Sequence, residues 1–192
     1  MKKVGLFTLA AMALITGGVI NAHQVSADTE PLHERLYRVY NPNSGEHLLT
    51  PAGWEVLTLE KAGWKSEGVA FYIPLTESPY SGYPVVQRLY NPNAGDHHYT
   101  TSDFEAASLV SIGWNNDGTA FRFPVAKANT GVPVYRLYNP NAKVGSHHFT
   151  MSSFERDSLI KAGWKNEGIA FNAYTKNCLL YTSDAADERI SI

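Results

Sequence analysis

Three histidines recur along the chain inside one pattern of polar residues. They are His47, His97 and His147. Each follows a Tyr-Asn-Pro-Asn run and a glycine, and each precedes a threonine by three residues. A histidine in such a pattern can bind a metal ion, contact a ligand or pair with a carboxylate. In the second and third copies another histidine follows at once, as His98 and His148.

The paired histidines invite interpretation as a metal site, but their spacing argues against it. Neighbouring residues of a strand point to opposite faces, so a histidine pair cannot easily share one ion. No cysteine or acidic cluster has the spacing of metal ligands. We therefore predict no metal site and no cofactor. Two interpretations stay open, in which the histidines are either hydrogen-bonded structural residues or contacts of a ligand.

Arginines and carboxylates recur in the same triplicate manner, one pair in each copy of the pattern. The pairs are Arg38 with Glu67, Arg88 with Asp117, and Arg136 with Glu167. A catalytic site needs an asymmetric set of groups, such as two carboxylates with different pKa values. Triplicate groups favour folding or multivalent binding instead, so we expect that the chain is not an enzyme. The guanidinium fork suits either a ligand contact or an ion pair that ties strands together.

Aromatic residues near the predicted turns complete the candidate binding site. Tyr40, Tyr90 and Tyr138 precede the turns, and Tyr99 and Phe149 follow the histidine pairs. A ring beside an exposed turn offers an amphipathic surface to a ligand. The predicted ligand contacts are His47, His97, His98, His147, His148, Tyr40, Tyr90, Tyr138, Tyr99, Phe149, Arg38, Arg88 and Arg136.

Two observations qualify this predicted site. The first copy carries Leu48 and Leu49 where the others have histidine and an aromatic residue, so its share of the site is doubtful. Trp64, Trp114 and Trp164 could stack on sugars, but each directly follows a predicted helix end. That position favours packing beneath the helix, and the tryptophans are left out of the predicted site.

The polar pattern is part of a repeat with a period of about 50 residues. Its copies span residues 31–74, 84–124 and 133–174, here called copies one, two and three. In each copy an aromatic and β-branched run ends at Asn-Pro, and a short second strand, a helix and a last strand follow. The prediction is an α+β fold, with three β-β-α-β repeats around a pseudo-threefold axis in a single domain. A β-trefoil-like fold is the alternative.

The helix of each copy is predicted from its ends. Ser-x-x-Glu patterns begin at Ser102 and Ser152, where they are typical of a helix start. The Gly-Trp pair of each copy fits the left-handed residue and hydrophobic contact that follow a helix end. Phe104 and Ile112 fall on one side of the second helix, which is the spacing of an amphipathic face.

The two ends of the chain are predicted to lie outside the domain of residues 28–176. Residues 1–27 combine Lys2 and Lys3, an apolar run and a small-residue site at Ala27, the pattern of a cleaved secretory signal. An uncleaved anchor is the alternative. No second apolar run of spanning length follows, so we expect no stable membrane insertion after cleavage. The product is expected to be secreted, extracellular or attached to the cell surface.

Cys178 is the only cysteine, so no intrachain disulfide can form. An exported domain without disulfides is more typical of Gram-positive bacteria. Cys178 also opens a tail, residues 178–192, that we interpret as artefactual. Residues 178–187 resemble, one for one, the in-frame translation of a transposase sequencing adapter.

The complete pattern resembles a repeat family catalogued as a domain of unknown function. It reads Val-Tyr-Arg-Leu-Tyr-Asn-Pro-Asn-x-Gly-x-His-x-x-Thr, then Ser-x-x-Glu, then Gly-Trp-x-x-Glu-Gly-x-Ala-Phe, within residues 33–174. The resemblance implies a secreted bacterial protein, because such repeats are often appended to glycoside hydrolases or peptidoglycan-cleaving enzymes. Association with these enzymes implies that the repeats attach to carbohydrate or cell wall.

These observations predict a secreted, noncatalytic module that binds a glycan or cell-wall polymer through repeated weak sites. The net charge of -2, from 16 basic and 18 acidic residues, argues against a nucleic-acid partner. Two alternatives stay open. The chain is then either an accessory part or remnant of a secreted glycoside or peptidoglycan hydrolase, or a protein-binding or structural surface module.

Overall fold

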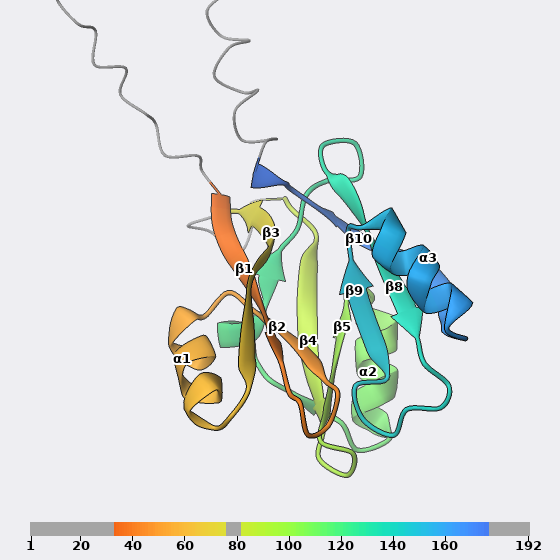
Figure 1. The fold of residues 1–192 in the computed structure, drawn as a ribbon. Coiled ribbons are helices and arrows are strands. Elements are labelled where there is room, and N and C mark those ends of the chain that lie inside the picture. The colour runs from red at the N-terminus through yellow and green to blue at the C-terminus, as the bar shows by residue number, and fades with distance from the viewer. Residues whose placement is uncertain (1–32, 76–81, 177–192) are drawn as a thin grey trace, which may run out of the picture. The chain divides into compact units, whose positions relative to one another are not determined.

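The computed structural model of the protein describes residues 33–75 and 82–176 (Figure 1). The predicted secretory signal, residues 1–27, and the predicted tail, residues 178–192, lie outside the described residues. The three sequence copies lie within them, save for two residues at the start of copy one.

The elements follow one order in all three copies, with additions in the second. Copy one holds β1 (His33–Tyr40), β2 (His47–Thr50), α1 (Gly53–Lys61) and β3 (Lys65–Pro74). Copy two holds β4 (Val85–Asn91), β5 (Asp96–Thr100), α2 (Asp103–Ser111), β6 (Asn115–Asn116), the 3-10 helix η1 (Thr119–Phe121) and β7 (Phe123–Pro124). Copy three holds β8 (Val132–Tyr138), β9 (His147–Thr150), α3 (Ser153–Lys161) and β10 (Lys165–Ala173).

Each copy builds one small antiparallel sheet around its first strand. The strand orders are β2-β1-β3, β5-β4-β6 and β10-β8-β9, and β7 also pairs with β4. The hairpin register places Tyr40 opposite His47, and Tyr138 opposite His147. The Tyr-Asn-Pro-Asn turn therefore brings the predicted tyrosine and histidine of a copy together.

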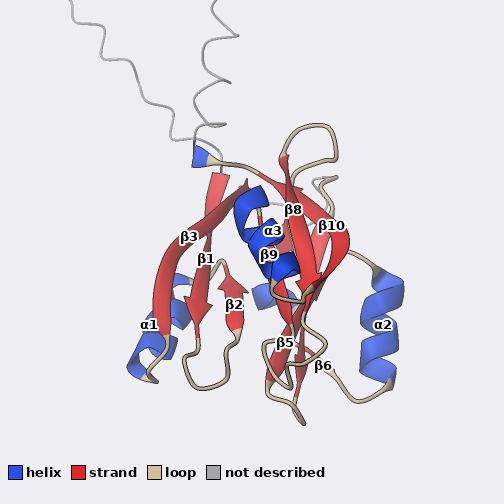
Figure 2. Cartoon of the chain, turned by 45° about the vertical axis from the view of Figure 1, so that its right-hand side comes forward, coloured by secondary structure: helices blue, strands red, loops and turns tan. Residues whose placement is uncertain are grey.

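The predicted fold class is wrong, because the protein is mostly β, with three small antiparallel sheets and three short helices. Neither an α+β arrangement of β-β-α-β repeats nor a β-trefoil describes it. Each helix has only nine residues, and Figure 2 shows the helices on the outside of the strands. Val56 of α1 and Ala106 of α2 are buried, whereas α3 buries none of its residues. Capping motifs fix where a helix begins and ends, but not how much of it is buried.

The core is built from strand residues of all three sheets. Its members are Leu36, Leu49, Phe71, Ile73, Val86, Tyr99, Phe123, Val125, Val134, Phe149, Phe171 and Ala173. The Tyr99 hydroxyl donates to the Leu49 carbonyl and accepts from the Leu49 amide, which joins copy two to copy one. Phe149 stacks on Phe171 at 6.2 Å between ring centroids. A core shared in this way requires all three copies to fold together.

Copy two departs from the others in its last strand. In copies one and three the phenylalanine of the Gly-x-Ala-Phe motif, Phe71 or Phe171, enters the core. In copy two the motif phenylalanine is Phe121, but the core residue is Phe123, two positions later. The two extra residues are accommodated by η1, which interrupts the strand. Phe121 therefore lies outside the core.

The predicted helix ends are confirmed. The Ser102 hydroxyl accepts from the Glu105 amide at 3.2 Å, and the Ser152 hydroxyl accepts from the Glu155 amide at 3.1 Å. At the other end of α2, the amide of Gly113 donates to Val110 and that of Trp114 to Leu109, which is the Schellman pattern. The same pattern ends α1 and α3. Trp114 itself is half-buried.

The predicted amphipathic face of the helices is not a buried face. Phe104 is 83% exposed and Ile112 is 72% exposed on α2. The second residue of each helix is a large aromatic side chain left in solvent, namely Trp54, Phe104 and Phe154. An exposed aromatic residue at three matched positions is an unusual use of apolar surface.

Gly113→Ala should lower the free energy of unfolding by about 1 kcal/mol, because a residue with a Cβ is strained in the left-handed region. Gly113 has a φ of 100°, and an added Cβ would meet nothing within 4 Å, so the cost is purely conformational. Chemical denaturation measures it. Gly53→Ala, in the first turn of α1 and equally open, is the matched control and should not destabilise. Equal stability of the Gly113 variant and the parent would contradict a strained helix end.

Candidate functional site

An arginine joins each pair of neighbouring copies by binding carboxylates from both. At the first junction, Arg38 Nε lies 2.5 Å from Glu67 of its own copy, and its Nη1 lies 3.6 Å from Glu155 of copy three. At the second junction, Arg136 Nε lies 2.9 Å from Glu167 of its own copy. Its Nη1 lies 3.1 Å from Glu105 of copy two. The sequence-predicted pairing of arginine with carboxylate is therefore only half of the contact.

The third junction repeats the arrangement between copies two and one. Arg88 Nε lies 2.5 Å from Asp117 of its own copy. Its two Nη atoms bind the two oxygens of Glu55 at 2.8 and 3.0 Å. Arginines of copies two, three and one thus reach the helices of copies one, two and three, respectively. The three arginine–glutamate contacts therefore form a closed cycle through the three copies.

The local sequence explains why the helix supplies the partner carboxylate. Glu55, Glu105 and Glu155 each occupy the third residue of their helix, where a capping-box glutamate would bond the backbone at the helix start. In α2 that backbone amide, of Ser102, donates instead to the Thr100 hydroxyl. The glutamate side chain is therefore free to reach across the junction.

Two histidines complete each of the first and second junctions. His148 Nε2 lies 3.1 Å from Glu155 and 3.2 Å from Arg38, and its ring packs edge-on against His47 at 4.7 Å. His98 Nε2 lies 3.2 Å from Glu105. The His98 ring packs against His147 at 4.6 Å.

This packing shifts the ionisation of the groups involved. The hydrogen bond from His148, reinforced by Thr150 and Arg38 against the effect of burial, lowers the pKa of Glu155 to about 2. The hydrogen bond from His98 likewise holds the pKa of Glu105 well below its usual range. Burial, together with the neighbouring histidine, lowers the pKa of His47 to about 4 and that of His147 to about 3. At neutral pH these two rings are uncharged.

The third junction is closed, whereas the other two are open. The position matched to His98 and His148 is Leu48, which offers no polar atom. The Phe121 ring lies 3.7 Å from the Arg88 guanidinium and 6.0 Å from the Trp54 ring. Arg88 is consequently 4% exposed, whereas the arginines of the open junctions, Arg38 and Arg136, are 20% and 22% exposed.

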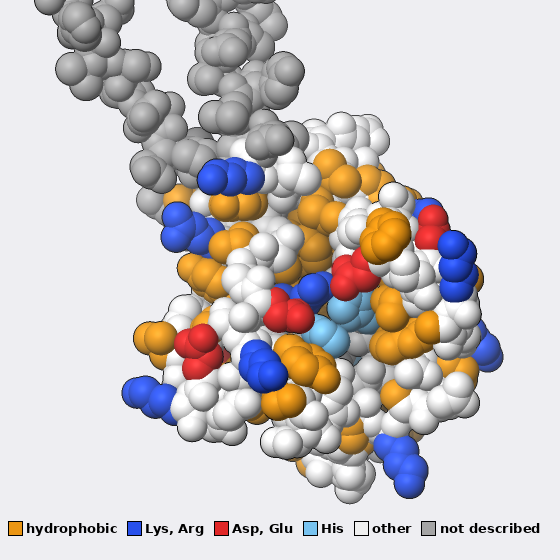
Figure 3. Space-filling view, viewed as in Figure 1, with side chains coloured by type: hydrophobic (Ala, Val, Ile, Leu, Met, Phe, Trp, Pro, Cys, Tyr) orange, Lys and Arg blue, Asp and Glu red, His pale blue; other side chains and the backbone are white. Residues whose placement is uncertain are grey.

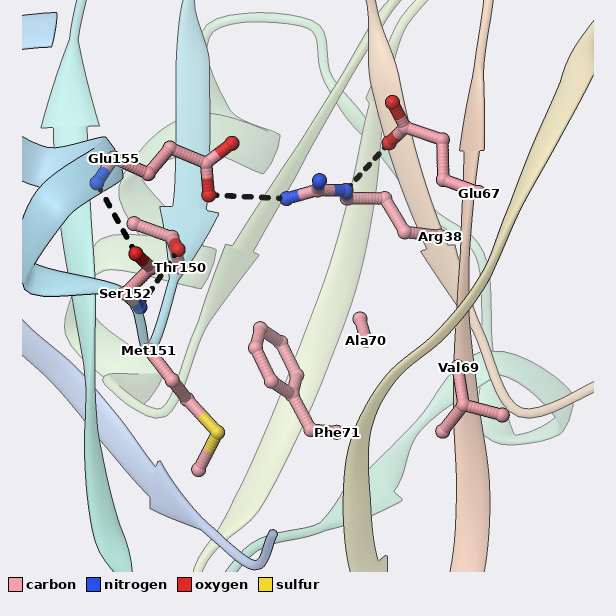
Figure 4. Close-up of a pocket in the computed structure, with 9 residues that line it drawn as sticks. All are labelled: Arg38, Glu67, Val69, Ala70, Phe71, Thr150, Met151, Ser152 and Glu155. Atoms are coloured by element: carbon pink, nitrogen blue, oxygen red, sulfur yellow. Dashed lines mark hydrogen bonds and ion pairs between the residues drawn. The ribbon is translucent and has the colours of Figure 1, made fainter. Parts of the chain in front are cut away.

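A pocket of about 250 Å³ opens at the first junction. Figure 4 shows Arg38 between Glu67 and Glu155, with Phe71 and Met151 lining the pocket beneath. Figure 3 shows histidine, acidic and basic side chains gathered in a hollow near the centre of this face, flanked by hydrophobic side chains. We call this the first groove.

A matching pocket, also of about 250 Å³, opens where copy three meets copy two. Its lining residues Ile169, Ala170 and Phe171 correspond to Val69, Ala70 and Phe71 of the first groove. The charged groups of the second junction, Arg136, Glu105 and Glu167, come from the corresponding strands and helix, β8, β10 and α2, and none of them lines this pocket. We call the site formed by these charged groups the second groove.

The predicted site residues fall into four places. Tyr99 and Phe149 are core residues, 1% and 3% exposed, and cannot touch a ligand from there. The histidines lie in the junctions, where they bond carboxylates. The tyrosines that precede the turns pack half-buried against the histidines, in the pairs Tyr40 with His47, Tyr90 with His97, and Tyr138 with His147. Arg38 lines the first groove, Arg136 lies at the second junction, and Arg88 is covered.

Sequence reasoning missed the helix residues of the site. The Ser-x-x-Glu pattern identifies the glutamates that bridge the junctions, Glu105 and Glu155, as capping residues only. The helical spacing assigns the exposed ring beside Glu105, Phe104, to an amphipathic helix face. The signal that could have found them is their repetition, because an aromatic-Glu pair follows the helix start in every copy.

Neither a metal centre nor a membrane span emerges from residues 33–75 and 82–176. Those residues contain no cluster of three or more histidine, cysteine, aspartate or glutamate side chains placed to hold a metal ion. No helix among them is long and apolar enough to cross a bilayer.

Comparison with known proteins identifies the domain but not its activity. Residues 33–174 match a family described as "Domain of unknown function (DUF5648)". No curated protein and no solved structure matches the chain.

Glu55→Gln should lower the free energy of unfolding by about 3 kcal/mol, because it leaves the buried Arg88 guanidinium short of a partner. Glu155→Gln removes the matched charge at the open first junction and should cost about 1 kcal/mol or less. Denaturant titration of the two variants gives the difference. Equal losses would contradict the distinction between closed and open junctions.

Stability should fall as the pH is lowered from 6.5 to 4. The unfolded chain protonates its histidines near pH 6.5, whereas folded His47 and His147 stay neutral until about pH 4 and about pH 3. Their contribution is therefore full above pH 6.5 and is lost below it, on the order of 1 kcal/mol per pH unit for each of the two histidines. Urea titrations across this range measure the loss, and the His47→Gln, His147→Gln double variant should lose less. A parent curve that is flat from pH 7 to 5 would show that the folded rings are protonated.

Proposed function

We propose that the chain, which belongs to the DUF5648 family, is a secreted noncatalytic module that binds carbohydrate of a cell wall or host surface. The binding sites are the first and second grooves. The observation that carries the proposal is the matched pair of open grooves, each combining an arginine, two carboxylates and a neighbouring exposed phenylalanine.

Sugar recognition fits this combination of groups. A sugar has hydroxyls that donate to carboxylates and accept from guanidinium groups, and an apolar face that packs on an aromatic ring. Glu67 and Glu155 keep 32% and 35% of their side chains exposed, so their oxygens are open to hydroxyl donors. Phe154, beside Glu155 in the chain, is 82% exposed.

The ionisation of the groove supports binding over hydrolysis. Glycoside hydrolysis needs one carboxylic acid with a raised pKa to protonate the leaving group. Glu155 and Glu105 have lowered pKa values, because histidine and arginine stabilise their charged forms. These carboxylates are suited to accepting hydrogen bonds and not to donating a proton. Attachment to a hydrolase, implied by the sequence resemblance, would give such a module the role of holding an enzyme on its substrate.

Two weak sites on one module gain from repetition. A polymer with many equivalent sugar units can occupy both grooves, and the second contact then forms at a high effective concentration. A shallow groove of about 250 Å³ is small for a tight ligand site, and repeated contact compensates for it.

A protein partner is the second candidate, favoured by the exposed apolar residues of the helices. Ile112 and Leu57 are 72% and 60% exposed, in addition to the aromatic residue that each helix leaves in solvent. Exposed apolar surface of this kind is found at protein interfaces.

The test is retention of the purified protein on Gram-positive cell walls, chitin and cellulose, with bovine serum albumin as the protein control. We expect retention on at least one polysaccharide. The Glu67→Gln, Glu167→Gln double variant should lose about tenfold in affinity, since each lost charge-assisted hydrogen bond is worth about 1 kcal/mol or more. Asp117→Asn, the matched change at the closed junction, should bind as the parent does. Folded protein that binds none of the polysaccharides would overturn the proposal in favour of a protein partner.

A further inference from the structure

Phe121 occupies the third junction as an internal ligand would. Its ring lies over the Arg88 guanidinium at 3.7 Å and beside Trp54 at 6.0 Å, with a 54° angle between the ring planes. Phe121 is there because the two-residue shift in copy two gives its core position to Phe123. The junction therefore shows what the space between a helix-start aromatic residue and a junction arginine can hold. It holds one six-membered ring.

The open grooves offer the same space without an internal occupant. Phe154 and Phe104 hold in α3 and α2 the position that Trp54 holds in α1, and they are 82% and 83% exposed. Arg38 and Arg136 correspond to Arg88. The phenylalanines that correspond in sequence to Phe121 are Phe71 and Phe171, and both are buried in the core. Within residues 33–75 and 82–176, no aromatic ring lies over Arg38 or Arg136 as Phe121 lies over Arg88.

The carboxylates distinguish a sugar ring from an aromatic side chain. In the closed junction both oxygens of Glu55 are bound by Arg88, so an apolar ring can cover the pair without stranding an acceptor. In the first groove Arg38 reaches Glu155 only at 3.6 Å, and both carboxylates stay about one-third exposed. In the second groove Arg136 binds both oxygens of Glu105 at 3.1 Å, but Glu105 and Glu167 also stay about one-third exposed. A purely apolar ring would desolvate these carboxylate oxygens without giving them new hydrogen bonds, and such burial of an unpaired polar group costs free energy. A pyranose ring replaces that water with its own hydroxyls.

The charge of the grooves selects among sugars. Each combines one arginine with two carboxylates, so these three groups together carry a net charge of -1. An acidic sugar would have to displace a carboxylate already bound to the arginine. The charge therefore disfavours uronic acids and phosphorylated sugars.

We infer that each open groove binds one uncharged pyranose ring in the position that Phe121 occupies at the closed junction. The apolar face of the sugar packs on Phe154 in the first groove or Phe104 in the second. Its hydroxyls bond the junction arginine and carboxylates. The pocket at the first groove, with a volume of about 250 Å³, matches a single ring, because it is below the range of about 300–1,000 Å³ that larger ligands occupy. The inference rests on the proposed function and specifies its ligand, its geometry and two sites per chain.

Ligand-observed NMR and calorimetry with defined probes test the inference on the purified protein. The probes are chitotetraose and cellotetraose as neutral sugars, tetragalacturonate as an acidic one, and the peptide Gly-Thr-Ala-Phe-Arg, which copies residues 118–122. We expect a neutral tetrasaccharide to bind at two sites per chain, at least tenfold more tightly than tetragalacturonate. Phe104→Ala and Phe154→Ala should each remove one site. Leu57→Ala, a change of an apolar side chain on α1 that is 60% exposed, is the control and should remove none.

Phe121→Ala adds a converse test, because it should uncover Arg88 and create a third, weaker site. If that variant is unstable, Phe104→Ala and Phe154→Ala still decide, since their exposed rings contribute little to folding.

The outcomes separate failure of the inference from failure of the proposed function. Neutral sugars that bind equally well to the parent and to both phenylalanine variants would overturn ring stacking but leave glycan binding intact. Retention on cell walls without binding of either neutral tetrasaccharide would overturn the inferred ligand but leave glycan binding intact. Equal binding of tetragalacturonate and the neutral sugars would do the same. Binding of the peptide alone, with no retention on any polysaccharide, would overturn both and identify the grooves as a protein-binding site.

Discussion

The fold depends on a guanidinium group held between two copies of the same sequence. The sheets are small, and the helices bury at most one residue each, so no copy has enough core to stand alone. Arg38, Arg88 and Arg136 each join a strand of one copy to the helix of another, above a core to which all three copies contribute. The short helices are thereby explained, since each needs only to present a glutamate to its neighbour and an aromatic ring to solvent.

One local change in the chain divides three similar junctions into two classes. The two extra residues of copy two move Phe121 from the core to the surface of Arg88, and Leu48 stands in the same junction where the others have His98 or His148. The resulting junction is largely covered, with its arginine 4% exposed, and one histidine remains in it, His97, 3.7 Å from Asp117. The open junctions instead keep their charges partly solvated and share them with histidines. The closed third junction therefore contributes most to stability, whereas the charged groups of the first and second junctions are accessible to solvent.

Local features could be predicted from the sequence, and features that depend on burial could not. The serine caps and glycine ends of the helices follow from backbone chemistry within a few residues, and the structure has them. The fold class, the burial of Tyr99 and the exposure of Phe104 depend on what packs from other copies, which periodicity alone does not reveal. The Gly-x-Ala-Phe motif does not reveal burial either, because Phe121 and Phe71 share the motif but not an environment. In the candidate site, the arginines and histidines were found from their repetition, whereas the glutamates were hidden by their second role as helix-start residues.

The closed direction of the arginine contacts also limits how such a sequence can grow. In an open array each unit touches only its neighbours, so units can be added at either end and capped. Here the arginine of copy one returns to the helix of copy three, and the cycle has no free end to extend. A fourth copy inserted in the chain would have to break one of these contacts and enlarge a shared core that three copies already fill. Duplication of the repeat within such a gene should therefore persist only when it adds three copies together, because three copies can form a second independent domain in the same chain.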